Sequence, residues 1–110
     1  MALIEKVQLC KVDELEPYQG RAAWVDGEQV ALFLVPNHGV FAIQNWDPIG
    51  KAYVLCRGIV GDVNGELCVA SPLYKQHFKL SSGECIEQPE TRLRTWPITI
   101  ENNSVVLSSE

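Results

Sequence analysis

One stretch decides the fold of this chain: Val69-Ala70-Ser71-Pro72-Leu73-Tyr74-Lys75-Gln76-His77-Phe78-Lys79-Leu80-Ser81-Ser82-Gly83. An apolar start leads into Pro72, which favours a loop, and the stretch ends on a Ser-Gly turn signal. Between loop and turn the side chains alternate across a strand, so that Phe78 and Leu80 share one face. The stretch therefore predicts a strand, a loop, a second strand and a turn.

Turn signals of the same kind recur at short intervals along the rest of the chain. They are Asp26-Gly27, Asn37-His38-Gly39, Asn64-Gly65 and Asn102-Asn103, besides Ser82-Gly83. The segments between them are rich in β-branched and aromatic residues and predict strands over 22–25, 29–35, 40–45, 58–63, 66–70, 77–80, 84–87, 96–101 and 104–107. Helical structure is expected only as single turns, at 12–15 and after an N-cap at Asp47. This pattern predicts an all-β sandwich or barrel with only short helical turns.

Length and composition indicate one globular domain over residues 1–110, with 46% hydrophobic and 21% charged residues. The longest apolar run, Val30 to Val35, is too short to span a bilayer. The N-terminus shows no secretory signal, so we expect a cytoplasmic location. A net charge of −5 without a polybasic run argues against nucleic-acid and membrane partners.

The four cysteines are Cys10, Cys56, Cys68 and Cys85. No two are separated by only two residues, so neither a zinc knuckle nor a thioredoxin-like redox pair is indicated. An even number leaves disulfides formally possible. Because no secretory signal is visible, we expect reduced thiols packed as small apolar side chains.

Longer motifs carry a family resemblance. They are Asn45-Trp46-Asp47-Pro48, the run from Val54 to Asp62 and the run from Val69 to Phe78. Over about residues 4 to 107 the chain resembles the small subunits of assimilatory NAD(P)H-dependent nitrite reductase, which belong to the Rieske-like superfamily. The resemblance implies a Rieske-like fold, in which antiparallel sheets form a sandwich or a partly open barrel.

A Rieske iron–sulfur centre is bound by a Cys-x-His loop and a Cys-x-x-His loop. By position, the four ligands would be Asn45, Asp47, Ser71 and Tyr74, and none of these supplies a thiolate or an imidazole. Neither His38 nor His77 follows a cysteine at the spacing that a shifted site needs. We therefore expect this chain to bind no metal and no cofactor itself.

Six residues are candidates for a partner interface: Trp46, Arg57, Tyr74, Lys75, His77 and Lys79. The last three share a predicted strand face, which is either a basic ridge that steers an acidic partner or an ordinary solvated face. Trp46 and Tyr74 either anchor an interface or fill the volume of the missing cluster. Arg57 either anchors an interface or ties down the connection between the two loops.

The remaining distinctive residues indicate packing rather than catalysis. Trp24 and Trp96 lie in predicted strands, so we expect both to be buried or half-buried. His38 lies in a turn and is expected to be exposed. Ser71 has no nucleophile-elbow context, which argues against serine-hydrolase chemistry.

What the resemblance implies is a non-catalytic subunit of a nitrite reductase complex that serves nitrogen assimilation. The large catalytic subunit is expected to carry FAD, a [4Fe-4S] cluster and sirohaem, and to reduce nitrite to ammonium with NADH or NADPH. This chain is expected to stabilise, orient or regulate it through the tip formed by residues 45–57 and 71–79. The alternatives are a small Rieske-like redox carrier and an interaction module of another oxidoreductase.

Overall fold

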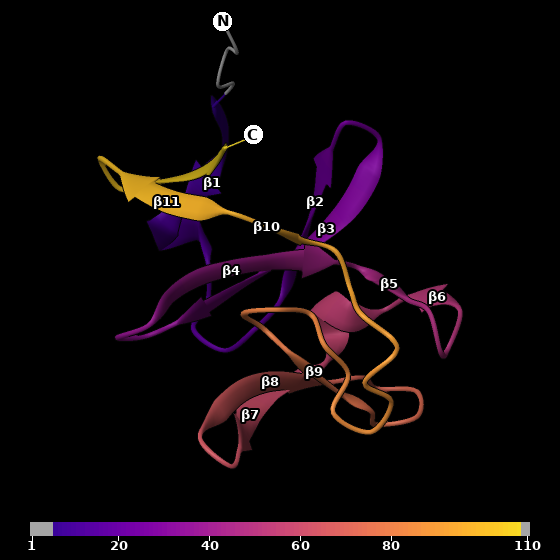
Figure 1. Cartoon of the computed structure of the whole chain (residues 1–110). Coiled ribbons are helices and arrows are strands. Elements are labelled where there is room, and N and C mark those ends of the chain that lie inside the picture. Colours follow the sequence, from indigo (N-terminus) through magenta and orange to yellow (C-terminus); the bar gives the residue numbers. More distant parts are fainter. Residues whose placement is uncertain (1–5, 109–110) are drawn as a thin grey trace, which may run out of the picture.

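The computed structural model describes residues 6–108, and most of its regular structure is β-strand (Figure 1). The strands are β1 (Lys6–Lys11), β2 (Arg21–Val25), β3 (Glu28–Val35), β4 (Gly39–Gln44), β5 (Trp46–Asp47), β6 (Ala52–Tyr53), β7 (Ile59–Val63), β8 (Glu66–Ala70), β9 (His77–Lys79), β10 (Thr95–Trp96), β11 (Ile98–Glu101) and β12 (Ser104–Ser108). Two 3-10 turns, η1 (Val12–Glu14) and η2 (Leu55–Arg57), are the helical segments of this part of the chain. No helix within residues 6–108 is long and apolar enough to cross a membrane. The predicted all-β class is confirmed.

Three sheets are stacked around two cores. The outer sheet has the strand order β1-β12-β11, the middle sheet β10-β4-β3-β2 and the tip sheet β7-β8-β9, while β5 and β6 form a short separate hairpin. In Figure 1 the middle sheet lies between the other two. None of these sheets closes on itself, so the predicted sandwich is an open stack and not a barrel.

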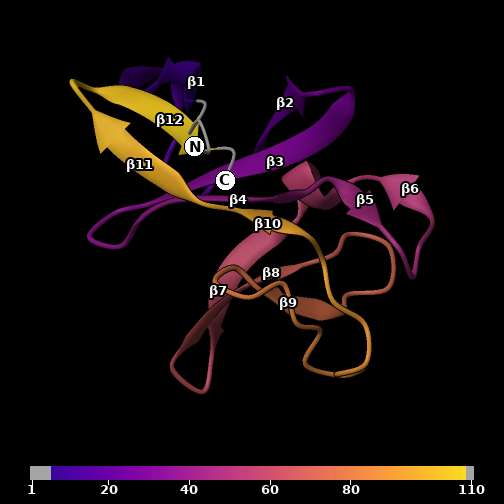
Figure 2. The ribbon, with the colours of Figure 1, turned by 45° about the horizontal axis from the view of Figure 1, so that its top comes forward.

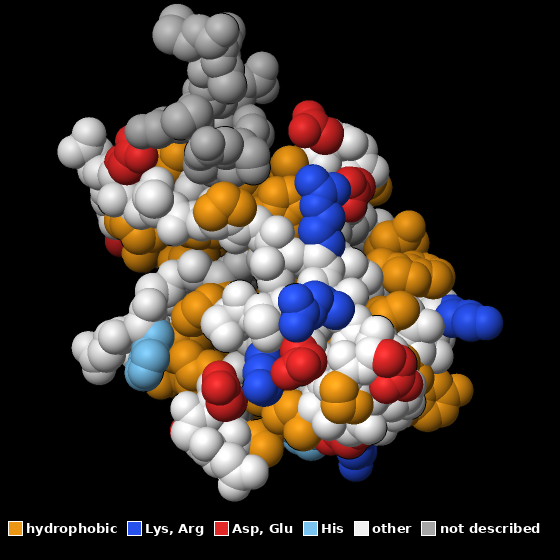
Figure 3. Space-filling model, in the orientation of Figure 1, with side chains coloured by type: hydrophobic (Ala, Val, Ile, Leu, Met, Phe, Trp, Pro, Cys, Tyr) orange, Lys and Arg blue, Asp and Glu red, His pale blue; other side chains and the backbone are white. Residues whose placement is uncertain are grey.

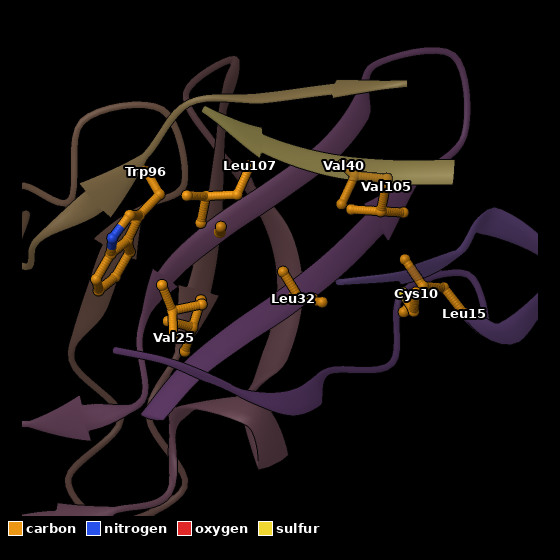
Figure 4. Packing of buried hydrophobic residues seen from close by; sticks show 10 residues of the cluster. Cys10, Leu15, Val25, Leu32, Val40, Trp96, Val105 and Leu107 are labelled. Atoms are coloured by element: carbon orange, nitrogen blue, oxygen red, sulfur yellow. The ribbon is translucent and has the colours of Figure 1, made fainter. Parts of the chain in front are cut away.

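The apolar run in β3 explains this arrangement. Its side chains alternate, so both faces of the strand meet apolar partners. Val30 and Leu32 belong to the core shared with the outer sheet, whereas Ala31 and Phe33 belong to the core shared with the tip sheet. Figure 4 shows the first core, where side chains from the N-terminal strand, β3, β10 and β12 meet. A run that is apolar on both faces is typical of a strand covered on both sides.

The predicted hairpins form where two residues with positive φ close the turn. Asp26 (φ 48°) and Gly27 (φ 80°) join β2 to β3, and Asn64 (φ 53°) and Gly65 (φ 86°) join β7 to β8. Two successive positive φ values define the type I′ turn, whose twist matches that of the flanking strands. The sequence signals for both hairpins are confirmed.

Two predicted strands differ from the structure. The segment 96–101 is interrupted at Pro97, where the chain leaves the middle sheet as β10 and enters the outer sheet as β11 (Figure 2). Proline has no N–H to donate to a ladder, so it fits this crossing point. The segment 84–87 forms no strand and contributes isolated bridges, Phe78 with Cys85 and Glu84 with Arg92.

The two strand tryptophans have opposite environments. Trp96 is 9% exposed and Arg94 stacks over its ring, as expected for a packed residue. Trp24 is 69% exposed, so its predicted burial is wrong. The reason is that β2 is an edge strand of the middle sheet, and only the face with Val25 is buried.

All four cysteines are free thiols, as expected. Three of them are buried: Cys10 and Cys85 in the two cores, and Cys68 on β8. Burial raises the pKa of each of these three thiols above its ordinary value. The buried thiols therefore act as small apolar side chains. His38 is exposed in its turn, as the sequence predicts.

Candidate functional site

The two loops that correspond to the Rieske ligand loops lie together at one end of the molecule. We call residues 45–57 and 71–79 the loop tip. A hydrogen bond joins them directly, because the Ser71 hydroxyl donates to Asp47 Oδ2 over 2.5 Å. Both residues are buried, at 1% and 0% exposure. Two former ligand positions are thus linked by their own side chains.

The Asp47 carboxylate is satisfied from its own loop. Its Oδ1 accepts hydrogen bonds from the backbone N–H groups of Ile49 at 2.8 Å and Gly50 at 3.0 Å. The sequence predicted a cap at this position, and the carboxylate does close the turn after β5. Together with the Ser71 hydroxyl, these donors compensate the cost of burying the carboxylate.

Asn45 attaches the loop tip to the rest of the fold. Its side-chain Nδ2 donates to Gln29 Oε1 on β3 at 2.9 Å, and its Oδ1 accepts from the Cys56 N–H at 2.7 Å. The side chain is 1% exposed, so both bonds are made away from solvent. Asn45 therefore joins the middle sheet to η2.

Ser71 also shapes the second loop. Its N–H donates to the Gln76 carbonyl, and its own carbonyl accepts from the Lys75 N–H. Lys75 closes this turn with φ 61° and precedes β9. It therefore does not share a strand face with His77 and Lys79, contrary to the sequence prediction. Tyr74 lies in the same turn and is 65% exposed.

These residues do not fit a [2Fe-2S] cluster. Such a cluster needs thiolate and imidazole ligands, whereas the buried positions carry an amide, a carboxylate and a hydroxyl. The polar atoms of Asp47 and Ser71 already bind one another and the loop backbone. Within residues 6–108, no three His, Cys, Asp or Glu side chains gather as a metal site.

The two aromatic candidates differ in their surroundings. Trp46 is half-buried and meets the ring of Tyr53 edge-on, with ring centroids 4.9 Å apart. Tyr74 is exposed, so it does not fill the space between the loops. The Asp47–Ser71 hydrogen bond instead closes the space between the loops. Leu73 also packs against Gly50: a Cβ added at Gly50 would lie 2.5 Å from Cδ1 of Leu73.

Two of the basic candidates are already paired with acidic residues of this chain. His77 Nδ1 lies 2.6 Å from Glu87 Oε2, and Lys79 Nζ lies 3.1 Å from Glu84 Oε1. The hydrogen bond to Glu84 raises the pKa of Lys79. Partial burial tends to raise the pKa of Glu87, but hydrogen bonds from the backbone and ring of His77 together lower it. The expected basic ridge is therefore largely neutralised at these two positions.

Arg57 and Lys75 are different. Both are exposed, and neither makes an ion pair within the described part of the chain. They come from different segments, η2 and the turn before β9, and they line one pocket. We call it the tip pocket; it has a volume of about 410 Å³ and is lined by Arg57, Ile59, Ala70, Ser71, Pro72, Lys75 and His77.

Ile59 is the pocket residue that the sequence interpretation missed. It is 77% exposed at the start of β7, an edge strand of the tip sheet. A β-branched residue in a predicted strand is expected to be buried, so the sequence does not reveal that Ile59 is exposed. The pocket thus unites three of the predicted interface residues, Arg57, Lys75 and His77, and leaves Trp46, Tyr74 and Lys79 outside its lining.

Comparisons with known proteins agree with this fold. Residues 5–108 match the family model described as a Rieske-like [2Fe-2S] domain. The nitrite reductase (NADH) small subunit of Salmonella typhimurium is 44% identical over 101 residues, which cover 90% of this chain and 93% of that protein. The NMR structure of the Escherichia coli protein NirD superposes with a TM-score of 0.89 at 37% identity and covers 97% of this chain and 98% of that one.

A third relative has a different organisation. The nitrite reductase [NAD(P)H] large subunit of Klebsiella oxytoca is 36% identical over 102 residues, which cover 93% of this chain but 11% of that protein. A segment that resembles most of this chain is therefore one part of a much longer polypeptide. On these matches, the chain belongs to the Rieske-like domain family, among the small subunits of NAD(P)H-dependent nitrite reductase.

Proposed function

We propose that this chain is a non-catalytic small subunit that docks onto the large subunit of a nitrite reductase through the loop tip. One observation carries the proposal: Asp47 and Ser71, two of the four ligand positions, bind one another, while beside them Ile59 is exposed and Arg57 and Lys75 make no ion pair within residues 6–108. The interior of the loop tip thus contributes stability, and its surface offers the recognition groups.

The Klebsiella oxytoca relative supports the identity of the partner. In that protein, a segment resembling this chain is part of a large subunit. In the single polypeptide, the covalent link holds the segment beside the rest of the large subunit at a high effective concentration, so we expect the separate small chain to bind a large subunit directly. The large subunit is expected to carry FAD, a [4Fe-4S] cluster and sirohaem, and to reduce nitrite to ammonium in the cytoplasm with electrons from NADH or NADPH.

The other predicted interface residues remain candidates within this proposal. Tyr74 is exposed in the turn between Pro72 and Lys75 of the tip pocket, whereas Trp46 lines a separate hollow with Tyr53. Both remain candidates because aromatic residues are enriched among interface anchors. His77 and Lys79 would contribute shape more than charge, because each already has a carboxylate partner. A redox-carrier role is less well supported, because the buried oxygen donors are unsuited to iron–sulfide chemistry.

Co-purification tests the proposal. The chain and the tagged large subunit of the same host are expressed together, and we expect a stable complex with nitrite reductase activity. The small chain purified alone should be colourless and free of iron. Failure of the two chains to associate, or a visible spectrum of a Rieske centre in the isolated small chain, would overturn it.

A further inference from the structure

The lining of the tip pocket combines apolar and cationic side chains. Ile59 and Pro72 supply apolar surface, and Arg57 and Lys75 supply two positive charges. Its volume, about 410 Å³, exceeds the space of one large side chain and lies at the lower end of the range of small binding pockets. A pocket of this build accepts an apolar group that is accompanied by negative charge.

Two basic side chains without a carboxylate partner line the tip pocket. The chain carries a net charge of −5, and four basic side chains of the described residues have a carboxylate within 4.0 Å: Arg21 with Glu14, Lys79 with Glu84, Arg92 with Glu84 and Arg94 with Glu28. Within residues 7–107, Lys11, Lys51, Arg57 and Lys75 make no ion pair. Figure 3 shows basic and acidic side chains next to one another on one face. Of the unpaired side chains, Arg57 and Lys75 line the same pocket, so their two charges are available to one partner segment.

Ile59 also borders a second hollow. A pocket of about 400 Å³, lined by Tyr18, Gln19 and Gly20 together with the segment Cys56–Val60, lies next to the tip pocket and shares Arg57 and Ile59 with it. Tyr18 is 52% exposed there. The pair Arg57 and Ile59 therefore forms a ridge between two hollows, and Arg and Tyr are frequent interface anchors.

From these features we infer that the tip pocket binds an extended acidic segment of the large subunit, which inserts one apolar side chain beside Ile59 while its carboxylates pair with Arg57 and Lys75. This inference rests on the proposed function and names the chemistry of the partner segment. The apolar contact contributes buried area, and the two charge pairs fix the register of the segment and speed its association.

Binding of purified variants to the immobilised large subunit tests the inference. Ile59→Asp removes the apolar contact, and Arg57→Glu and Lys75→Glu each reverse the charge of one pocket residue. We expect each variant to weaken binding at least about tenfold, the scale of an interface hot spot. Two matched controls lie in the outer sheet, on β1 and β11: Lys11→Glu makes the same charge change, and Ile100→Asp removes an apolar side chain that is 48% exposed. Both should change the affinity less than about twofold.

The outcomes separate the inference from the proposed function. No binding by the wild-type chain would overturn both. Normal binding by the wild type and by all three pocket variants would overturn the inference alone, and so would equal losses in the pocket variants and the controls. Hydrogen exchange of the large subunit, with and without the small chain, identifies the protected segment. We expect this segment to contain Asp or Glu beside an apolar residue. Protection of a basic or wholly polar segment would contradict the inference. The inference would also be contradicted if inorganic phosphate occupied the pocket and subunit binding stayed unchanged.

Discussion

Replacing Ser71 by alanine tests whether the hydrogen bond between the two loops stabilises the fold. The substitution removes the donor to Asp47 Oδ2 and leaves that buried oxygen with no partner among the groups that bind it now. The other carboxylate oxygen keeps its bonds to Ile49 and Gly50. The hydroxyl also accepts a longer hydrogen bond, 3.3 Å, from the Leu73 N–H. The cavity left by one hydroxyl is small, so the lost bond to the buried carboxylate dominates.

The magnitude follows from the charge of the acceptor. A hydrogen bond to a charged group contributes about 1.5–3 kcal/mol. The unfolding entropy of 110 residues is about 0.23 kcal/mol/K, so Ser71→Ala should lower Tm by about 6–13 °C. Asp47→Asn should be milder, because its amide oxygen still accepts from the loop backbone and its amide N–H can donate to the Ser71 hydroxyl.

Urea unfolding followed by circular dichroism measures the free energy of unfolding of each variant. Ser81→Ala is the matched control, because Ser81 is exposed and its change should alter the free energy by less than about 0.5 kcal/mol. If Ser71→Ala falls within that same limit, the loops are held together by other contacts and the reasoning is refuted.

Three further results are expected. Gly20→Ala should destabilise the fold by about 1–3 kcal/mol or more in urea unfolding, because a Cβ at Gly20 would lie 2.1 Å from the Cys56 carbonyl oxygen. Glu87→Gln should lower stability slightly at neutral pH, by well under about 1 kcal/mol because the side chain is partly exposed. Because the pKa of Glu87 is lowered in the folded chain, its contribution to stability is present above the ordinary carboxyl pKa of about 4.3 and is lost as pH falls through the folded pKa. In a pH series of urea unfolding, the unfolding free energies of the wild type and the variant should therefore converge as the pH falls through that folded pKa. With a thiol reagent near neutral pH, Cys56 should react before the other three cysteines, because it is only half-buried and burial raises the pKa of each of the others.

Each of these results has a control. Gly61→Ala should be neutral, since nothing lies within 4 Å of a Cβ there, and an equal loss at Gly61 and Gly20 would contradict the steric reasoning. Glu90→Gln changes an exposed acid and should leave the free energy of unfolding unaltered at neutral pH, so an equal loss there would remove the role assigned to Glu87. Cys56→Ser should abolish the fast thiol phase, and its persistence would show that another cysteine is accessible.

The local parts of the fold were predictable because short-range signals determine them. Asn64-Gly65 closes its hairpin as expected, and η1 forms at the predicted turn. The crossing at Pro97 was missed because an apolar segment on both sides of one proline reads as a single strand. The exposure of Trp24 was missed because the edge position of its strand depends on strand order, which alternation does not reveal.

The candidate site was predictable in its positions but not in its contacts. The sequence identifies Asn45, Asp47 and Ser71 as replaced ligand positions, yet the bond between Asp47 and Ser71 arises only when two loops 24 residues apart meet. The meeting of Arg57 with Lys75 has the same origin, because each comes from a different segment. Long-range packing of loops is what sequence periodicity leaves undetermined.

Because β3 packs on both faces, binding at the loop tip should stabilise distant parts of the molecule. One strand supplies Leu32 to the core under the outer sheet and Phe33 to the core under the tip sheet, so neither core can open without disturbing the same backbone. A partner that binds only the folded chain stabilises it by the free energy of binding. This increases the free energy needed to unfold any part of the chain that unfolds together with the binding site. Amide protons of the distant strand β12 should therefore exchange more slowly when the loop tip is occupied, although no partner atom comes near them.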